Sequence, residues 1–376
     1  MSDVRLTYTD VEAELRSAVR RLLADREDLP AQLVAMEHEV PHDGSTWKAL
    51  DEEMGLSLLV LPEEIGGAGA GAHELGVVME EIGHHLAPVP FLGHAALAAG
   101  VVARLGSPAL VERFTRSTPT AVAVPVHRAW FDPFPEQVRW SGEHLDGAVD
   151  LVLDATHATT LLLPAVSDDG PVLVLCDAAA AARARVAGFD LTRDLSRIDL
   201  DGVPGEVVAR GDAARVALTA GTHLATAALA CEQVGIAERA LELAVEHARA
   251  RMQFGRAVGS FQAVKHRLAD AWVAVTQARA AARNAVDAVA RDDDVALALA
   301  VASIVTDDAA VLAAETCVQA HGGLGFSWEH PAHLFLKRAR ANMQAFGSAE
   351  AHLDLVADLA DLPAPHPNET RHEVIR

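Results

Sequence analysis

The stretch Arg251-Met-Gln-Phe-Gly-Arg-Ala-Val-Gly-Ser-Phe-Gln262 lies between two long helical patterns. A second cluster of polar residues and glycines, Gln319-Ala-His-Gly-Gly323, follows further along the chain. Segments of this kind, between helices, are where binding groups gather on a rigid scaffold. We interpret the rest of the chain as the support that holds these two clusters in place.

Helical periodicity surrounds both clusters. Before Arg251, apolar residues recur every three or four positions and charged residues fill another face, as in an amphipathic helix. After it, Ser260 is the expected N-cap of a second helix whose apolar residues recur with steps of four and three. A third pattern covers about 295–319 and stops at Gly322-Gly323, because glycine readily adopts the left-handed backbone that ends helices. A fourth begins near Pro331.

Composition limits the possible classes of function. The chain has 376 residues, enough for two or three domains, and 51% of them are hydrophobic while 22% are charged. The formal net charge of −22 argues against a nucleic-acid surface, which needs clustered cations. The three cysteines are widely spaced, which fits a reducing compartment. The chain start lacks a signal-peptide pattern and no apolar run suggests a membrane span, so we expect a cytoplasmic protein.

Residues 1–117 are predicted to form a helical N-terminal domain, with Asp10 as the cap of its first helix. Glu81 and His84 have the Glu-x-x-His spacing of a di-iron ligand pair. That chemistry needs a second such pair on a facing helix, and the other pair in this chain lies in its polar C-terminal tail. The sequence therefore predicts no metal site.

The pattern changes over residues 118–208 to short β-type runs separated by turn residues, which predicts a small antiparallel β-domain. Residues 209–362 then return to helical periodicity, and residues 363–376 are polar and proline-containing, as in a mobile tail. The predicted fold class is mainly α with a small central β-domain. The β-type runs are Ala121–Val126, Gln137–Trp140, Val149–Leu153, Leu161–Val166 and Pro171–Cys176.

Three motifs carry a family resemblance: Arg251-x-Gln253-Phe254-Gly255, Phe261-Gln262 and Gln319-x-x-Gly322-Gly323-x-Gly325-Phe326. In this order and spacing they resemble the C-terminal half of the acyl-CoA dehydrogenases, which are FAD-dependent enzymes. The resemblance implies a helical N-terminal domain, an antiparallel β-domain and a C-terminal four-helix bundle. It also implies α,β-desaturation of an acyl-CoA thioester, with an electron-transfer flavoprotein or a similar acceptor.

The same resemblance implies contacts to the adenine and pyrophosphate half of the FAD of a neighbouring subunit. Guanidinium groups pair with phosphate oxygens, side-chain amides donate and accept, and glycines let a backbone approach an anionic ligand. The alternative is that Arg251 forms a salt bridge at a helix end while the glycines only cap a helix. The residues implied as FAD contacts are Arg251, Gln253, Phe254, Gln262, Gln319, Gly322, Gly323 and Ser348.

The catalytic half of the family pattern is missing. Proton abstraction from the thioester α-carbon needs a carboxylate poised beside it. The usual glutamate of the family corresponds to Phe346, and the base position of another branch corresponds to Ala225. A phenylalanine at that place fills the space of the base, so the sequence predicts no catalytic residue in this chain.

The flavin-ring half is missing as well. The Thr-Glu-Pro loop of the family has no counterpart here, and the strand that supplies its hydroxyl and aromatic wall corresponds to residues 147–153, which have neither. Trp130 or Trp140 is an alternative for the wall, although a tryptophan of the β-domain core is the favoured interpretation.

This imbalance resembles actinobacterial α2β2 acyl-CoA dehydrogenases, in which one subunit supplies the base and the ring pocket and the other has lost them. Our leading hypothesis is that the chain is the non-catalytic member, partnered by a catalytic subunit. A rival is a homo-oligomeric flavoenzyme that recruits Glu329 or Glu350 as its base, although these also fit a solvated loop charge and a first-turn carboxylate. A third interpretation is a scaffold that kept the fold without binding flavin.

Overall fold

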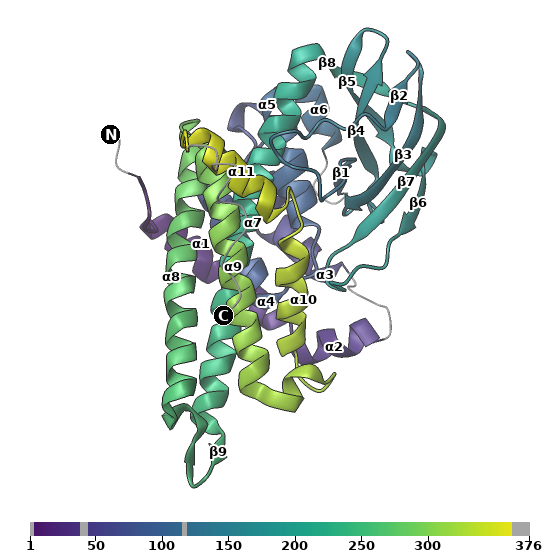
Figure 1. The fold of residues 1–376 in the computed structure, drawn as a ribbon. Helices are drawn as coiled ribbons and strands as arrows, with labels where there is room; N and C mark the ends of the chain where they lie inside the picture. Colours follow the sequence, from purple (N-terminus) through teal and green to yellow (C-terminus); the bar gives the residue numbers. More distant parts are fainter. Residues whose placement is uncertain (1–3, 38–43, 115–118, 363–376) are drawn as a thin grey trace, which may run out of the picture.

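The computed structural model describes residues 4–37, 44–114 and 119–362, so the predicted tail at 363–376 lies outside the described residues. Helices form both ends of this span, and a β-sheet lies between them in sequence (Figure 1). In space, the sheet stands beside the upper part of a helical bundle whose longest helices extend well below it. The predicted class, mainly α with a central β-domain, is confirmed.

The N-terminal part is helical, as predicted, but its first cap is not Asp10. Thr9 is the N-cap of α1 (Asp10–Arg26): its hydroxyl accepts a hydrogen bond from the Glu12 N–H, and the Glu12 carboxylate accepts one from the Thr9 N–H. This reciprocal capping box satisfies two backbone donors, so it prevails over a cap one residue later. The other helical elements here are α2 (Leu29–Glu37), α3 (Ser45–Lys48), η1 (Ala49–Glu53), η2 (Leu56–Leu58), η3 (Glu63–Ile65), α4 (Ala72–His85), η4 (Leu92–Ala98), α5 (Ala99–Leu105) and α6 (Pro108–Arg113).

The strands form one sheet in the order β6-β7-β3-β2-β4-β5-β8, with β1 on β4. The prediction of a purely antiparallel sheet is wrong for two pairings, because β1 and β2 each run parallel to β4. Strand β3 pairs with one edge of β2 in the antiparallel direction. Strand β4 pairs with the other edge of β2 and runs parallel to it. The strands are β1 (Thr120–Val122), β2 (Val138–Trp140), β3 (His144–Leu153), β4 (Thr160–Ser167), β5 (Gly170–Asp177), β6 (Ala182–Arg185), β7 (Leu195–Pro204) and β8 (Glu206–Arg210).

The C-terminal bundle is built on α7, which has 40 residues and is therefore about 60 Å long. The expected cap of α8 at Ser260 is wrong, because a short turn, η6 (Val258–Ser260), takes up that residue and Phe261 is the N-cap. The elements of the bundle are α7 (Gly211–Ala250), β9 (Met252–Gln253), β10 (Arg256–Ala257), α8 (Gln262–Arg291), α9 (Val295–His321), η7 (Gly322–Phe326), α10 (Ala332–Asn342) and α11 (Ala349–Leu359).

Two glycines let α4 and α7 pack backbone to backbone. A Cβ atom at Gly235 of α7 would lie 1.9 Å from the carbonyl oxygen of Glu80, and one at Gly83 of α4 would lie 2.2 Å from the carbonyl oxygen of Glu232. Both distances are far below van der Waals contact, so any side chain at these positions would force the two helices apart. The N-terminal helices and the bundle therefore share one core along α7.

The most apolar helix of the chain is longer than the sequence analysis allowed. Val295–Phe326 is long enough to cross a membrane and contains an 18-residue window with a mean hydropathy of 1.9, which corrects the expectation that no such run exists. In the structure, α9 packs against α7, α8, α10 and α11. Neighbouring helices of the bundle thus cover much of its apolar surface, as in the central helix of a helical core.

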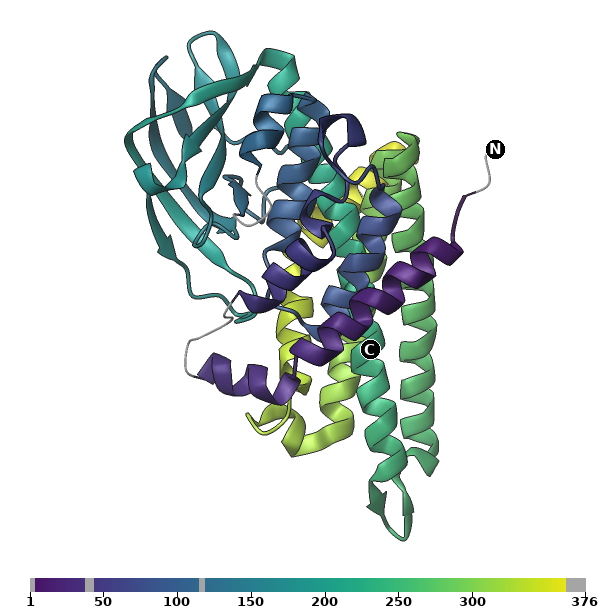
Figure 2. The ribbon, with the colours of Figure 1, turned by 180° about the vertical axis from the view of Figure 1, so that it is seen from behind.

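Buried ion pairs fasten α1 across the back of the bundle (Figure 2). The carboxylate of Glu12 accepts a hydrogen bond of 2.7 Å from Nη2 of Arg283 on α8, and both side chains are fully buried. One turn further on, Arg16 and Arg20 both donate to the buried carboxylate of Glu81 on α4. Helix α1 is therefore held by ion pairs whose carboxylates are buried, and the Glu12–Arg283 pair is buried on both sides.

We expect Glu12→Ala to lower the free energy of unfolding by about 3–5 kcal/mol, because it leaves the buried guanidinium of Arg283 without its carboxylate. Urea denaturation followed by circular dichroism measures the change. Glu14→Ala, at an exposed position of the same helix, is the matched control and should change stability by less than about 0.5 kcal/mol. Equal effects of the two substitutions would show that the buried pair does not hold α1.

Candidate functional site

The stretch Arg251–Gln262 forms a β-hairpin that projects from the lower end of α7 and α8 (Figure 1). Strands β9 and β10 are joined by Phe254 and Gly255, which have φ angles of 52° and 75°. Two successive positive φ angles suit the tight turns of two-residue hairpins, but at a phenylalanine this backbone is strained. The Phe254 ring is also 90% exposed. An aromatic ring held in water on a strained turn indicates a contact surface.

The polar residues of the hairpin also face solvent. The side chains of Arg251, Gln253 and Gln262 are exposed. Within residues 4–37, 44–114 and 119–362, Arg251 has no ion pair; only its backbone is bonded, to His247 and Val258. The alternative that Arg251 forms a salt bridge at a helix end therefore has no support in the described part of the chain.

The second cluster ends α9 next to the hairpin. Gln319 is exposed, and Gly322 has a φ angle of 62° and caps the helix, as the alternative interpretation holds. A Cβ atom at Gly322 or Gly323 would meet nothing within 4 Å, so both glycines border open space. Close packing therefore does not explain why both residues are glycines. The close approach of a ligand to the backbone would explain it.

A stack of three imidazoles, which the sequence analysis missed, connects the two clusters. The His321 ring lies 4.2 Å from the His247 ring and 4.0 Å from the His330 ring, measured between centroids. Burial and the neighbouring imidazoles lower the pKa of His330 to about 4. The three histidines of the stack come from α7, α9 and the loop before α10. They are too far apart in the sequence to form a recognisable motif. The stack shows that Arg251 and Gly322 follow helix ends that lie side by side.

We call the exposed residues of these two clusters the hairpin surface: Arg251, Gln253, Phe254, Gln262, Gln319, Gly322 and Gly323. Ser348 does not belong to it. It caps α11, where its hydroxyl accepts from the Ala351 N–H, and lies at the opposite end of α10, a helix of about 17 Å. The structure therefore brings seven of the eight predicted contacts together and leaves Ser348 apart.

Phe346 is buried where the bundle meets the β-domain, and its backbone is hydrogen-bonded to two neighbouring residues. Its N–H donates to the Val126 carbonyl at 2.6 Å, and its carbonyl accepts from the Trp130 N–H at 3.1 Å. The Trp130 ring packs against His223 and His352. The main-chain carbonyl of Trp130 accepts a hydrogen bond from the Thr222 hydroxyl. We call Phe346, Trp130, Thr222, His223 and His352 the Phe346 cluster.

The two tryptophans have different places. Trp140 lies in the core of the β-domain, as the favoured interpretation has it, whereas Trp130 packs in the shared core between the sheet and the helices. Ala225 is fully buried in α7. Both recruited-base candidates are exposed, and Glu329 lies in the loop before α10, at the far end of that helix from Phe346. Glu350 is in the first turn of α11, where a carboxylate favours the helix dipole.

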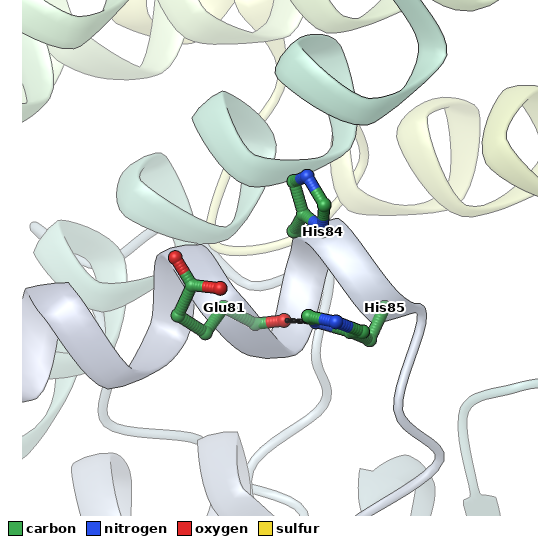
Figure 3. Close-up of side chains that lie close together, drawn as sticks. All are labelled: Glu81, His84 and His85. Atoms are coloured by element: carbon green, nitrogen blue, oxygen red, sulfur yellow. Dashed lines mark hydrogen bonds between the residues drawn. The ribbon is translucent and has the colours of Figure 1, made fainter. Parts of the chain in front are cut away.

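Glu81, His84 and His85 come close together on α4, with one potential metal-ligand atom from each (Figure 3). Each residue is already engaged, because Arg16 and Arg20 hold the Glu81 carboxylate, His84 Nε2 lies 3.1 Å from a carboxylate oxygen of Glu242, and His85 Nδ1 lies 2.9 Å from the Glu81 carbonyl oxygen. Figure 3 shows the Glu81 carboxylate turned away from both imidazoles. Two guanidinium groups beside the carboxylate would repel a metal cation, so the arrangement indicates a structural ion network.

A second buried network joins the β-domain to the bundle. The Glu232 carboxylate on α7 accepts hydrogen bonds from Arg193, just before β7, and from Arg338 of α10, and Asn342 lies against the same group. Burial by itself would raise the pKa of Glu232, but the two guanidinium groups hold it at about 2. Glu232 therefore stays ionised and fixes α10 relative to the sheet.

Comparison with known proteins agrees with this architecture. The family model described as the acyl-CoA dehydrogenase N-terminal domain matches residues 9–118, and the one for the acyl-CoA dehydrogenase C-terminal domain matches residues 214–360. The chain belongs to the acyl-CoA dehydrogenase family, whose members bind FAD. It is 32% identical to the acyl-CoA dehydrogenase IpdE2 of Mycolicibacterium smegmatis, over 90% of this chain and 95% of that protein.

Solved structures give the same result. A chain in the crystal structure of the ChsE4-ChsE5 complex from Mycobacterium tuberculosis matches with a TM-score of 0.84 and 30% identity, over 96% of this chain and 100% of that one. A chain of a variant of the Tcur3481-Tcur3483 steroid acyl-CoA dehydrogenase matches with a TM-score of 0.81 and 29% identity, over 94% of this chain and 98% of that one. Butyryl-CoA dehydrogenase from Megasphaera elsdenii, 18% identical with a TM-score of 0.84 over 94% of this chain and 99% of that one, shares the fold.

We expect Phe346→Glu to destabilise the chain by more than about 3 kcal/mol at pH 8, because it removes a buried ring and places an uncompensated carboxylate in the cluster. The loss should be smaller at pH 5, since burial raises the pKa of such a carboxyl and keeps it neutral there. Urea denaturation at both pH values measures this. Phe346→Leu is the control, at about 1 kcal/mol. A glutamate tolerated as well as leucine at pH 8 would mean that the cluster has room and solvent for a base.

Proposed function

We propose that this chain is the non-catalytic subunit of an FAD-dependent acyl-CoA dehydrogenase that desaturates an acyl-CoA thioester. In this proposal it binds the adenine and pyrophosphate half of an FAD whose ring lies in a catalytic partner, in an α2β2 assembly. The observation that carries the proposal is the contrast between the exposed hairpin surface and the closed Phe346 cluster.

The hairpin surface suits a nucleotide diphosphate. No side chain in the described part of the chain pairs with the Arg251 guanidinium, which leaves it available for phosphate oxygens, and Gly322 and Gly323 leave their backbone open to an anionic ligand. The amides of Gln253, Gln262 and Gln319 add donors and acceptors. Bound FAD would supply the hydride acceptor of the reaction, while the residues of this chain would hold its nucleotide end. The 90% exposed ring of Phe254 fits a site completed by a second chain.

The Phe346 cluster does not suit a flavin ring or a thioester. Two main-chain hydrogen bonds tie Phe346 to Val126 and Trp130, so an isoalloxazine ring between them would have to break both. The side chains of the cluster are aromatic rings, imidazoles and a hydroxyl, and none of them is a carboxylate base. We therefore assign proton abstraction to the partner, in keeping with similarity to chains of the ChsE4-ChsE5 complex and of the Tcur3481-Tcur3483 steroid enzyme.

The test is the flavin content of the purified complex that this chain forms when it is co-expressed with a catalytic acyl-CoA dehydrogenase subunit, sought first as the product of the neighbouring gene. We expect Arg251→Ala to lower bound FAD per complex at least tenfold at limiting FAD, since a charge-assisted phosphate contact contributes about 1.5–3 kcal/mol. Arg249→Ala, an exposed arginine at the end of the same helix, is the matched control and should leave FAD content unchanged. Equal FAD content in both variants would contradict the proposed nucleotide contact.

The rival functions predict different outcomes for the chain purified alone. A homo-oligomeric flavoenzyme with a displaced base would be yellow and would oxidise acyl-CoA thioesters with an artificial electron acceptor. Its activity would then fall in Glu329→Gln or Glu350→Gln. A scaffold would be colourless even with its partner, and Arg251→Ala would leave every activity intact. Our proposal requires an inactive isolated chain and a yellow, active complex.

A further inference from the structure

A cavity of about 480 Å³ lies where the N-terminal helices, the β-domain and α10 meet. This volume is within the range of small-molecule sites in proteins. Its walls contain neither Phe346 nor any residue of the hairpin surface. Part of the wall is apolar, made by Trp47 of α3 and the segment Pro88–Pro90. The cavity therefore shares no lining residue with the hairpin surface or the Phe346 cluster.

Asp154 is the buried acid on this wall. It follows β3, is 5% exposed, and its Oδ2 accepts a 3.0 Å hydrogen bond from the Gly93 N–H. Gly93 makes room for it, because a Cβ atom there would lie 2.4 Å from that oxygen. Within the described ranges, Asp154 has no ion-pair partner. Its φ angle of 57° is also strained for a residue other than glycine, a feature that gathers at functional sites.

Arg193 and Arg338 attract the Asp154 carboxylate and lower its pKa, but among the described residues neither forms an ion pair with it. The two arginines on the wall, Arg193 and Arg338, already share the carboxylate of Glu232. Four carboxylates and three cations line the cavity, so its balance is negative. The titratable and charged groups that share the cavity with Asp154 are Lys48, Asp51, Glu52, His157, Arg193, Asp194 and Arg338.

We propose that this cavity binds a small molecule with an ammonium group on an apolar body, and that Asp154 is the counterion of the ammonium. The Trp47 ring and the prolines would cover the apolar body, and tryptophan is the best aromatic neighbour for a cation. A carboxylate ligand would meet Asp154 and Asp194 and be repelled. This site is independent of the flavin contacts proposed above.

Ionisation of Asp154 gives the proposal a pH signature. Burial is the main cause that raises the pKa of Asp154, from 3.8 to about 7. Arg193 and Arg338 oppose this rise, and the neighbouring Asp194 adds to it. When Asp154 is protonated it carries no charge and cannot act as a counterion. Alkyl ammonium groups stay charged between pH 5.5 and 8. Binding of an amine should therefore strengthen as the pH rises from 5.5 to 8. In the absence of ligand, the contribution of Asp154 to stability falls as the pH rises from about 4 to about 7, because in this range the acid is ionised in the unfolded chain and still protonated in the folded one.

The experiment uses the full chain and three probes of one shape, cyclohexylamine, cyclohexanol and cyclohexanecarboxylate, followed by ligand-observed NMR titration. We expect the amine to bind at least tenfold more tightly than the other two at pH 8, and at least tenfold more weakly at pH 5.5 than at pH 8. Asp154→Asn should remove this preference, while Asp150→Asn, an exposed acid on β3 paired with Arg197, should keep it. His157→Gln should keep the pH profile, which excludes the imidazole on the wall as its source.

Three results would overturn the proposal: equal binding of the amine and the alcohol, an amine affinity that does not change between pH 5.5 and 8, or full amine binding by Asp154→Asn. The folded state of Asp154→Asn is checked by its melting temperature, which should exceed that of the parent chain at pH 8 because no buried carboxylate remains. If that variant does not fold, the pH profile of His157→Gln still decides, because with the imidazole removed Asp154 is the wall group expected to ionise near pH 7.

Discussion

The ionised carboxylate of Glu232 is the interaction on which the arrangement of this molecule depends. It lies on α7 next to the point where Gly83 and Gly235 let α4 and α7 touch, and it accepts hydrogen bonds from Arg193 and Arg338. The three parts of the chain thus meet at one buried negative charge. Neutralising it would leave the buried guanidinium of Arg193 without its carboxylate and would leave Arg338 with its ion pair to Asp190. This loss would weaken the hold on both the sheet and α10.

Fixing α10 also fixes the two regions at its ends. At one end, the loop before the helix joins the imidazole stack beside the hairpin surface, where the backbone is open. At the other end, Phe346 is bonded through its main chain to Val126 and Trp130, where the space is filled. One helix therefore separates the open hairpin surface from the closed Phe346 cluster. In the proposed function these are the half of the family site that this chain contributes and the half that its partner supplies.

Much of this was predictable from sequence. The helix ends at Gly322 and near Pro331, the five β-type runs and the family followed from periodicity, glycine positions and ordered motifs. Caps were less predictable, because Thr9 prevailed over Asp10 through a carboxylate three residues away, and a turn displaced Ser260. Strands β6, β7 and β8 were missed. The alternating alanines and arginines of β6 give no apolar run, and charged residues interrupt the apolar residues of β7. The imidazole stack, the Glu232 network and the Asp154 cavity arise from residues far apart in sequence, so only the fold brings them together.

The most direct measurement is the structure of this chain bound to its catalytic partner and FAD, at a resolution that shows the flavin. Our account predicts the pyrophosphate against Arg251 and Gly322 of this chain and the isoalloxazine ring between strands of the partner. It also predicts unbroken main-chain bonds from Phe346 to Val126 and Trp130. A flavin ring lying between Trp130 and Phe346 of this chain, with a carboxylate beside its thioester site, would contradict it.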